Sequence, residues 1–74
     1  MIRIMTTYVK YYDHHYMSGF GYGYISGYTH YNGGTYAVVV KQDNTIEEIP
    51  LVNVYVVSEQ EYEDNTIGRW KTTV

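Results

Sequence analysis

A glycine–aromatic alternation from Gly19 to Tyr28 constrains the fold of this chain more than any other feature. In an extended strand, alternate residues point to opposite faces. One face of this segment would carry glycines and the other its larger side chains, namely Phe20, Tyr22, Tyr24, Ser26 and Tyr28. Glycine inside a strand is typical of a bend, a bulge or a closely approaching backbone. We therefore expect a strongly bent strand up to Tyr31, with a disordered or self-associating low-complexity segment as the alternative.

The flanking sequence predicts further short strands, because it is rich in β-branched and aromatic residues. Asn32-Gly33 and Asp43-Asn44 are turn sequences that tolerate positive φ. Pro50 cannot donate to a ladder and should end a strand, after which Leu51-Val52-Asn53 fits a single tight turn. The expected strands are 1–12, 35–41, 45–49 and 54–57, with a bulge or register change allowed between Ile46 and Ile49.

A short helix is expected near the C-terminus. Ser58 followed three residues later by Glu61 matches a capping box, in which side chains satisfy the free amides of a helix start. The acidic residues that follow suit the positive end of a helix dipole. We expect one to two turns over 59–64, ended near Asn65, and then a last edge strand or a mobile tail over 66–74.

This order of elements resembles the small SH3-like barrels, in particular the KOW- and Tudor-like variety. The residues that carry the resemblance are Gly23-Tyr24-Ile25, Tyr36–Val40, Asp43–Ile46 and Ile49–Val54, which span roughly half of the chain. The resemblance implies a recognition module without chemistry. The fold class is therefore expected to be all-β: one domain over 1–74, a bent five- or six-stranded SH3-like barrel with a short helical turn near the C-terminus. An OB-fold or a small open sheet is the alternative.

The tyrosines are the candidate contact residues. Nine of the eleven lie between positions 8 and 36, more than one small core can hold, and an exposed aromatic patch usually marks a partner. Tyrosine offers a large rigid area with a polar tip, so it is enriched at interfaces. The predicted partner-binding residues are Tyr22, Tyr24, Tyr28, Tyr31 and Tyr36. The alternative is that about half of these rings form the core.

Charge and cysteine content narrow the class of partner. The net charge is −3, with few cations in the first half and an acidic second half, whereas nucleic-acid binders usually present a basic surface. There is no cysteine, which fits a reducing compartment, and no signal-peptide pattern at the N-terminus. The longest apolar stretch, 49–57, is too short to cross a membrane. A cytoplasmic protein without a membrane partner is expected.

No pattern in the sequence predicts catalysis, a metal or a cofactor. The serines lack a nucleophile-elbow motif, and no cysteine nucleophile exists. Asp13, His14, His15 and His30 are metal-ligating residue types, but their spacing matches no metal motif. We therefore expect a non-enzyme with no catalytic residue, no metal and no cofactor.

Three functions remain open from the sequence. The leading hypothesis is a binding module or inhibitor that modulates another protein, a host protein or complex subunit, through its Tyr-rich face. The compact single-purpose chain would suit a viral (phage) or mobile-element protein. The second hypothesis is binding of nucleotides or single-stranded nucleic acid by Tyr stacking, helped by Arg3, Lys10 and Lys41. The third is a structural, self-assembling homo-oligomer driven by edge strands and Tyr patches.

Overall fold

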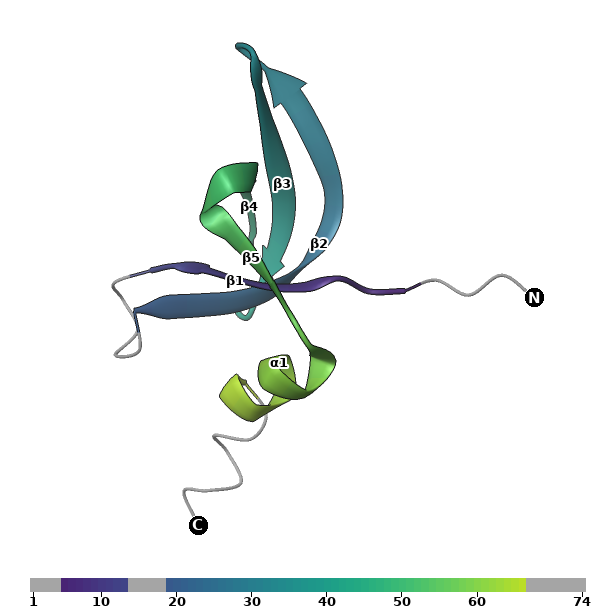
Figure 1. Ribbon diagram of the computed structural model, residues 1–74, viewed down its shortest axis with the longest axis vertical. Coiled ribbons are helices and arrows are strands. Elements are labelled where there is room, and N and C mark those ends of the chain that lie inside the picture. Colours follow the sequence, from purple (N-terminus) through teal and green to yellow (C-terminus); the bar gives the residue numbers. More distant parts are fainter. Residues whose placement is uncertain (1–4, 14–18, 67–74) are drawn as a thin grey trace, which may run out of the picture.

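A computed structural model of the chain describes residues 5–13 and 19–66. The described elements are the strands β1 (Tyr8–Tyr12), β2 (Phe20–Tyr31), β3 (Gly34–Lys41), β4 (Ile46–Pro50) and β5 (Val54–Val57), the 3-10 helix η1 (Leu51–Asn53) and the helix α1 (Glu59–Asn65). All strand pairs are antiparallel, and the sheet order is β4-β3-β2-β1-β5 (Figure 1). The all-β prediction with a short C-terminal helix is confirmed. The expected sixth strand or tail beyond residue 66 lies outside the described residues, as do His14 and His15.

The long strand β2 organises the sheet because it belongs to both halves. Its first half pairs with β1, and its second half pairs with β3. Figure 1 shows the strand running beside β1 and then turning sharply upward to follow β3. The segment expected to bend therefore does so, and it forms an ordered strand along its whole length. The bend folds the two halves of the sheet toward each other around a small core.

A β-bulge at Ser26 changes which side chains share a face. Ile25 pairs with Val39, but the next pair is Gly27 with Val38, so Ser26 is an extra residue in β2. Its hydroxyl donates to the carbonyl of Val38 at 3.2 Å. An inserted residue reverses the alternation that follows it. The prediction of one shared face from Phe20 to Tyr28 is therefore wrong beyond Ser26.

At the bend of β2, atoms of other strands lie close to the Cα atoms of two glycines, Gly21 and Gly23. A Cβ on Gly21 would lie 2.6 Å from the ring of Tyr11, its cross-strand partner. A Cβ on Gly23 would collide with the backbone carbonyl of Val40 and lie 2.8 Å from a methyl group of Val39. Gly27, in contrast, has open space where a side chain would be. Only the first two glycines are thus explained by close packing.

The core is small, and all five strands contribute to it. It consists of Val9, Tyr11, Ala37, Val39 and Ile49, with the partly buried Ile25 and Val54 packed against it. Paired residues of an antiparallel ladder share a face, and the pairs Ile25–Val39 and Ala37–Ile49 place these side chains together. We call this side of the sheet the core face and the opposite side the outer face.

The turns follow the residue types predicted for them. Asn32 and Gly33, with φ of 51° and 75°, form the tight link between β2 and β3. The turn between β3 and β4 is longer than the expected two residues. The amide of Asn44 donates to the carbonyl of Lys41, and Asn44 itself has a φ of 67°. The register of β3 with β4 is continuous from Val40–Ile46 to Tyr36–Pro50, so the register change considered for β4 does not occur.

The helix α1 begins as its capping sequence predicts. The Ser58 hydroxyl accepts a hydrogen bond from the amide of Glu61 at 3.0 Å, and the helix extends one residue beyond the predicted range, to Asn65. The Glu61 carboxylate contacts the sheet: Tyr22 donates to it at 3.3 Å, and Lys10 forms an ion pair with it at 3.5 Å. This helix therefore covers part of the outer face at β1 and β2.

Candidate functional site

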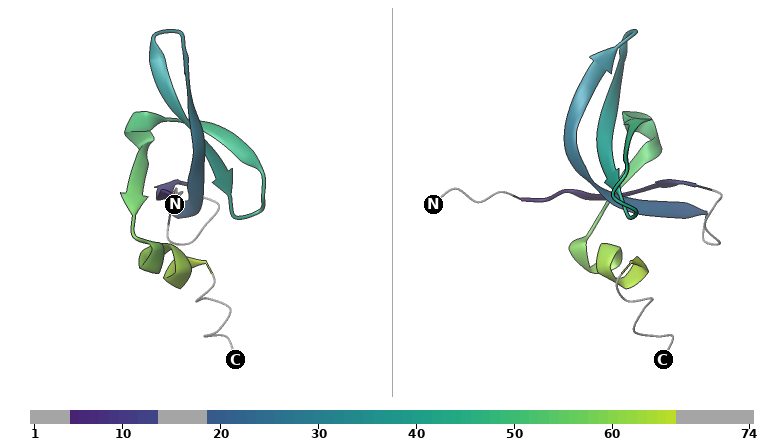
Figure 2. Two further views of the ribbon diagram at one scale, coloured as in Figure 1. Left: turned by 90° about the vertical axis from the view of Figure 1, so that its right-hand side faces the viewer. Right: turned by 180° about the vertical axis from the view of Figure 1, so that it is seen from behind.

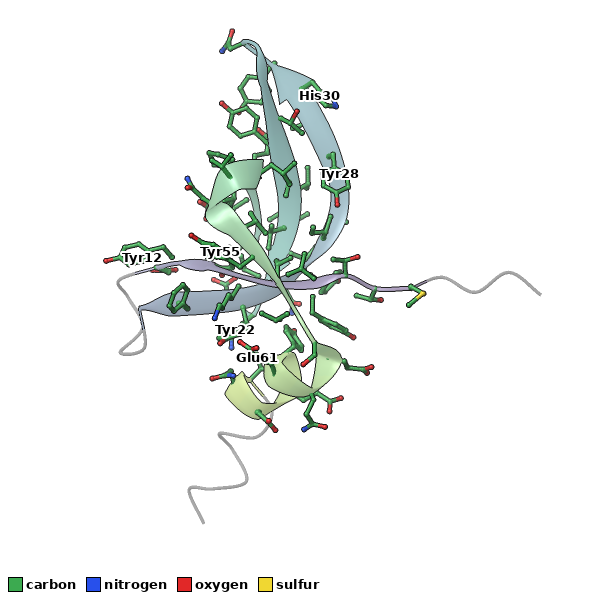
Figure 3. All side chains as sticks on the ribbon, in the orientation of Figure 1. Tyr12, Tyr22, Tyr28, His30, Tyr55 and Glu61 are labelled. Atoms are coloured by element: carbon green, nitrogen blue, oxygen red, sulfur yellow. The ribbon has the colours of Figure 1, made fainter. Side chains whose placement is uncertain are left out.

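The structure divides the five tyrosines that the sequence predicted as one contact face. Tyr22 is only 5% exposed and lies under α1, where its hydroxyl meets Glu61 (Figure 3). Tyr24 lies beside Tyr8 on the same outer face and is partly exposed. Tyr28 pairs with Ala37 on the core face, yet it is 57% exposed because it lies beyond the core cluster.

The remaining two predicted tyrosines, Tyr31 and Tyr36, form a stacked pair near the β2–β3 turn. Their ring centroids are 4.4 Å apart, and their planes differ by 5°. The Tyr31 hydroxyl donates to the Glu48 carboxylate of β4 at 3.1 Å. This hydrogen bond raises the pKa of Tyr31, because the carboxylate favours the neutral phenol. The two rings thus stack on each other beside a negative charge, in contrast to a platform that is open to stacking with a ligand.

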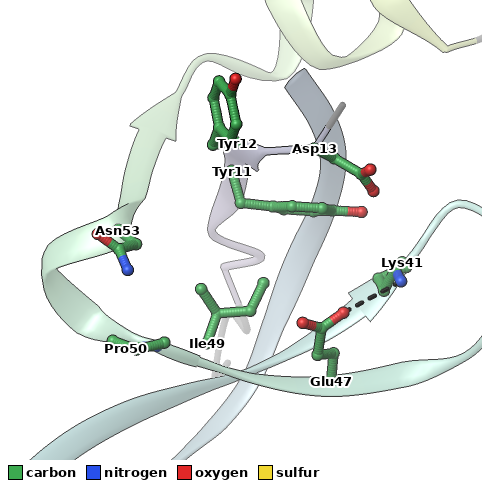
Figure 4. A pocket seen from close by; sticks show the side chains of 8 residues that line it. All are labelled: Tyr11, Tyr12, Asp13, Lys41, Glu47, Ile49, Pro50 and Asn53. Atoms are coloured by element: carbon green, nitrogen blue, oxygen red, sulfur yellow. Dashed lines mark hydrogen bonds and ion pairs between the residues drawn. The ribbon is translucent and has the colours of Figure 1, made fainter. Parts of the chain in front are cut away.

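A pocket of about 570 Å³ opens where the end of β1 faces the corner formed by β4 and η1 (Figure 4). Its size falls within the roughly 300–1,000 Å³ that small ligand sites occupy. The lining residues are Tyr11, Tyr12, Asp13, Lys41, Glu47, Ile49, Pro50 and Asn53. Tyr11 and Ile49 are core residues and form its buried part, whereas Tyr12 is 67% exposed.

The pocket is apolar on one side and charged on the other. Tyr12, Ile49 and Pro50 supply apolar surface, and Asn53 adds an amide that can both donate and accept. At the other end, Lys41 donates to Glu47 at 3.1 Å, an interaction that raises the pKa of Lys41. With Asp13, the lining carries two acids against one base. The arrangement can hold a partly apolar ligand and favours a positive group at its charged end.

Among the described lining residues, the carboxylates of Asp13 and Glu47 and the ammonium of Lys41 are the ionisable groups that could take part in proton transfer. A nucleophilic lysine needs a lowered pKa, whereas the pKa of Lys41 is raised by its partner. The sequence reasoning missed this pocket, although it predicted a strand end before Asp13 and another at Pro50. Only the bend of β2 brings those two strand ends together.

A second aromatic cluster on the outer face holds α1 against the sheet, and the sequence reasoning missed it too. Tyr62 of α1 packs on Tyr8 with ring centroids 4.5 Å apart. Burial raises the pKa of Tyr62, with smaller effects from Tyr8 and Tyr24. Beside it, the Lys10 ammonium lies 4.8 Å from the ring centre of Phe20. Tyr62 thus contacts β1, and the neighbouring Glu61 contacts both β1 and β2.

Metal binding finds no support in the part of the chain that the structure describes. Residues 5–13 and 19–66 contain no cluster of three or more acidic, histidine or cysteine side chains that could hold an ion. His30 lies in β2, where its Nδ1 is 3.0 Å from the hydroxyl of Thr35 on the paired strand. His30 thus bridges two strands as part of the hairpin.

Comparisons with known proteins do not place this chain in a family. No protein-family model, no curated protein and no solved structure matches it. Within the described residues, the helices are too short and too polar to span a bilayer. The function must therefore be argued from the site itself.

Proposed function

We propose that this chain is a non-catalytic binding module that holds an extended segment of a partner protein in the pocket between β1 and the β4–η1 corner. The observation that carries the proposal is the composition of that pocket: Tyr12, Pro50 and Asn53 are among its lining residues, and its other end is acidic. Extended peptides, proline-rich ones among them, dock in aromatic-lined grooves where polar groups bond their backbone. The acid excess favours a segment that carries a basic residue.

The fold supports a recognition role of SH3-like type. The features that support this part of the proposal are the 3-10 turn between β4 and β5 and the bent second strand. Membership of the SH3-like barrels, action as an inhibitor or accessory of the partner, and a cytoplasmic setting belong to the same proposal. A fold by itself supports no particular ligand, so the test addresses the pocket.

Peptide binding followed by NMR tests the proposal directly. The probe is a library of short peptides that are extended, partly apolar and proline-containing, each with or without one arginine. We expect a subset with arginine to shift the amide signals of Asp13, Asn53 and their neighbours. Tyr12→Ala and Asn53→Ala should each weaken that binding about tenfold, which corresponds to ~1.4 kcal/mol.

The matched control is Tyr28→Ala, which removes an exposed hairpin tyrosine that does not line the pocket and should leave peptide binding unchanged. Loss of binding in this variant instead of the pocket variants would assign the contact to the hairpin tyrosines and overturn the proposal. A single-stranded oligonucleotide serves as a second probe. Salt-sensitive oligonucleotide binding without any peptide binding would favour the nucleic-acid hypothesis.

A further inference from the structure

The two edges of the sheet differ in how they resist pairing with another strand. The edge strand β4 contains Glu47, Glu48 and Pro50, and charges and proline are features that protect sheet edges. The other edge strand, β5, has the sequence Val-Tyr-Val-Val and contains neither a charge nor a proline. Tyr55 is 51% exposed and Val56 is 74% exposed. An uncharged, apolar edge of this kind is a template for strand pairing.

The helix that follows β5 leaves its outer edge uncovered. α1 contacts β1 and β2, which lie on the inner side of β5 in the sheet order. In the left view of Figure 2, β5 runs along the margin of the molecule, with no other described element beside its outer edge. Val56 pairs with the fully buried Val9 and so faces the core side, but its own side chain is left in solvent.

We propose that two copies of this chain pair through their β5 strands, antiparallel and about a twofold axis perpendicular to the sheet. Such pairing continues each five-stranded sheet into the other. Because paired residues share a face, the twofold axis must place either Tyr55 or Val56 opposite its own copy. Neither choice opposes like charges, whereas the same pairing through β4 would bring Glu47 or Glu48 close to its own copy.

The size of the core gives a physical reason for this association. Among the described residues, only six apolar or aromatic side chains are buried, and domains of this length are marginal when they rely on one core. Pairing at β5 would cover Val56 and Tyr55 with the partner strand. A four-residue strand pair buries less than the ~1,200 Å² of a stable interface. A weak dimer, formed in a concentration-dependent manner, is therefore expected.

Sedimentation of the full chain over a range of concentrations tests the pairing. The wild type should shift from monomer to dimer within the micromolar range. Val56→Lys should shift the dissociation constant at least tenfold upward, because it places two ammonium groups near the axis. The matched control is Ile46→Lys, at an apolar and similarly exposed position on the β4 edge, and it should dimerise like the wild type. A wild type that stays monomeric up to millimolar concentration overturns the proposal.

Cysteine cross-linking tests the geometry, since the chain has no native cysteine. Residues that oppose each other across an antiparallel pair have Cα atoms ~4.5–5.5 Å apart, within disulfide range. Under mild oxidation, either Tyr55→Cys or Val56→Cys should give a covalent dimer, while Ile46→Cys should not. Equal cross-linking at Ile46 and at both β5 positions would indicate random collision and contradict the pairing. These results are independent of peptide binding, so the β5 dimer and the peptide pocket can fail separately.

Discussion

At the scale of the residue, the glycines of β2 lie in different surroundings, although they look alike in the sequence. Gly23 lies where β3 crosses the bend, and the backbone of Val40 occupies the space that a side chain would need. Gly21 supports the ring of Tyr11. Gly27 follows the bulge, faces open space and has no positive φ. Close backbone approach therefore requires glycine at Gly23, whereas Gly21 leaves room for a side-chain ring and Gly27 meets nothing.

Gly23→Ala should destabilise the protein because the added methyl group collides with the backbone of Val40 and with Val39. Overpacking a rigid site of this kind costs roughly 1–3 kcal/mol. Urea denaturation followed by circular dichroism measures the loss as a lower midpoint.

The matched control for that substitution is Gly27→Ala in the same strand. It adds the same methyl group to open space and reduces the freedom of the unfolded chain, so it should be neutral or stabilise by up to about 1 kcal/mol. Equal losses for both variants would contradict the assignment of close packing to Gly23.

At the scale of the element, three strands are tied together on the outer face by one cluster. Tyr31 of β2 stacks on Tyr36 of β3 and donates to Glu48 of β4. On the same hairpin, the His30–Thr35 contact links β2 to β3. The longest hairpin of the protein thus gains side-chain support where it extends beyond the core.

The Tyr31–Glu48 hydrogen bond predicts a pH dependence. It raises the pKa of Tyr31 in the folded state above the unfolded value near 10, so its stabilising effect is complete below that value. The effect is lost as the pH rises through the folded-state pKa, because ionised Tyr31 would face the Glu48 carboxylate. NMR titration of the Tyr31 ring should show the raised pKa. Glu48→Gln should return it toward the ordinary value, and the neighbouring Glu47→Gln should leave it unchanged.

At the scale of the whole molecule, the sheet is covered on both faces, and β1 takes part in both covered regions. The core face closes on Val9 and Val39 between its two bent halves, while α1 covers β1 and the first half of β2 on the outer face. Tyr62 on Tyr8 anchors this second cluster. Because β1 contributes to both clusters, unfolding of the helix and unfolding of the sheet should be coupled.

Tyr62→Ala tests that coupling. It should lower the stability of the whole protein by roughly 2 kcal/mol, about half the cost of deleting a fully buried aromatic ring, since Tyr62 is partly exposed. Helix signals by circular dichroism and the β3 amide signals by NMR should share one lowered urea midpoint. Glu63→Ala, an exposed change on the same helix, should have little effect. Loss of helix signal with an unchanged β3 midpoint would show that α1 is an independent appendage.

Local residue chemistry was sufficient to predict most elements of this protein. Asn32-Gly33 and Asn44 adopt the positive φ that their residue types favour, and Ser58 caps α1 because its hydroxyl can reach the Glu61 amide. These features depend on neighbours in the chain, so the sequence by itself determines them.

The tertiary structure alone decided where surfaces and sites form. The alternation in β2 predicted one row of tyrosines, but the extra residue at Ser26 reversed the faces, and α1 buried Tyr22. The pocket unites Asp13 with Pro50 and Asn53, which lie some forty positions away in the sequence, through the bend of β2. A β-bulge leaves one residue unpaired in the ladder, and the contacts that offset this loss come from strands that are distant in the sequence. Its position therefore depends on how β3 packs across Gly23, and no local pattern specifies that packing.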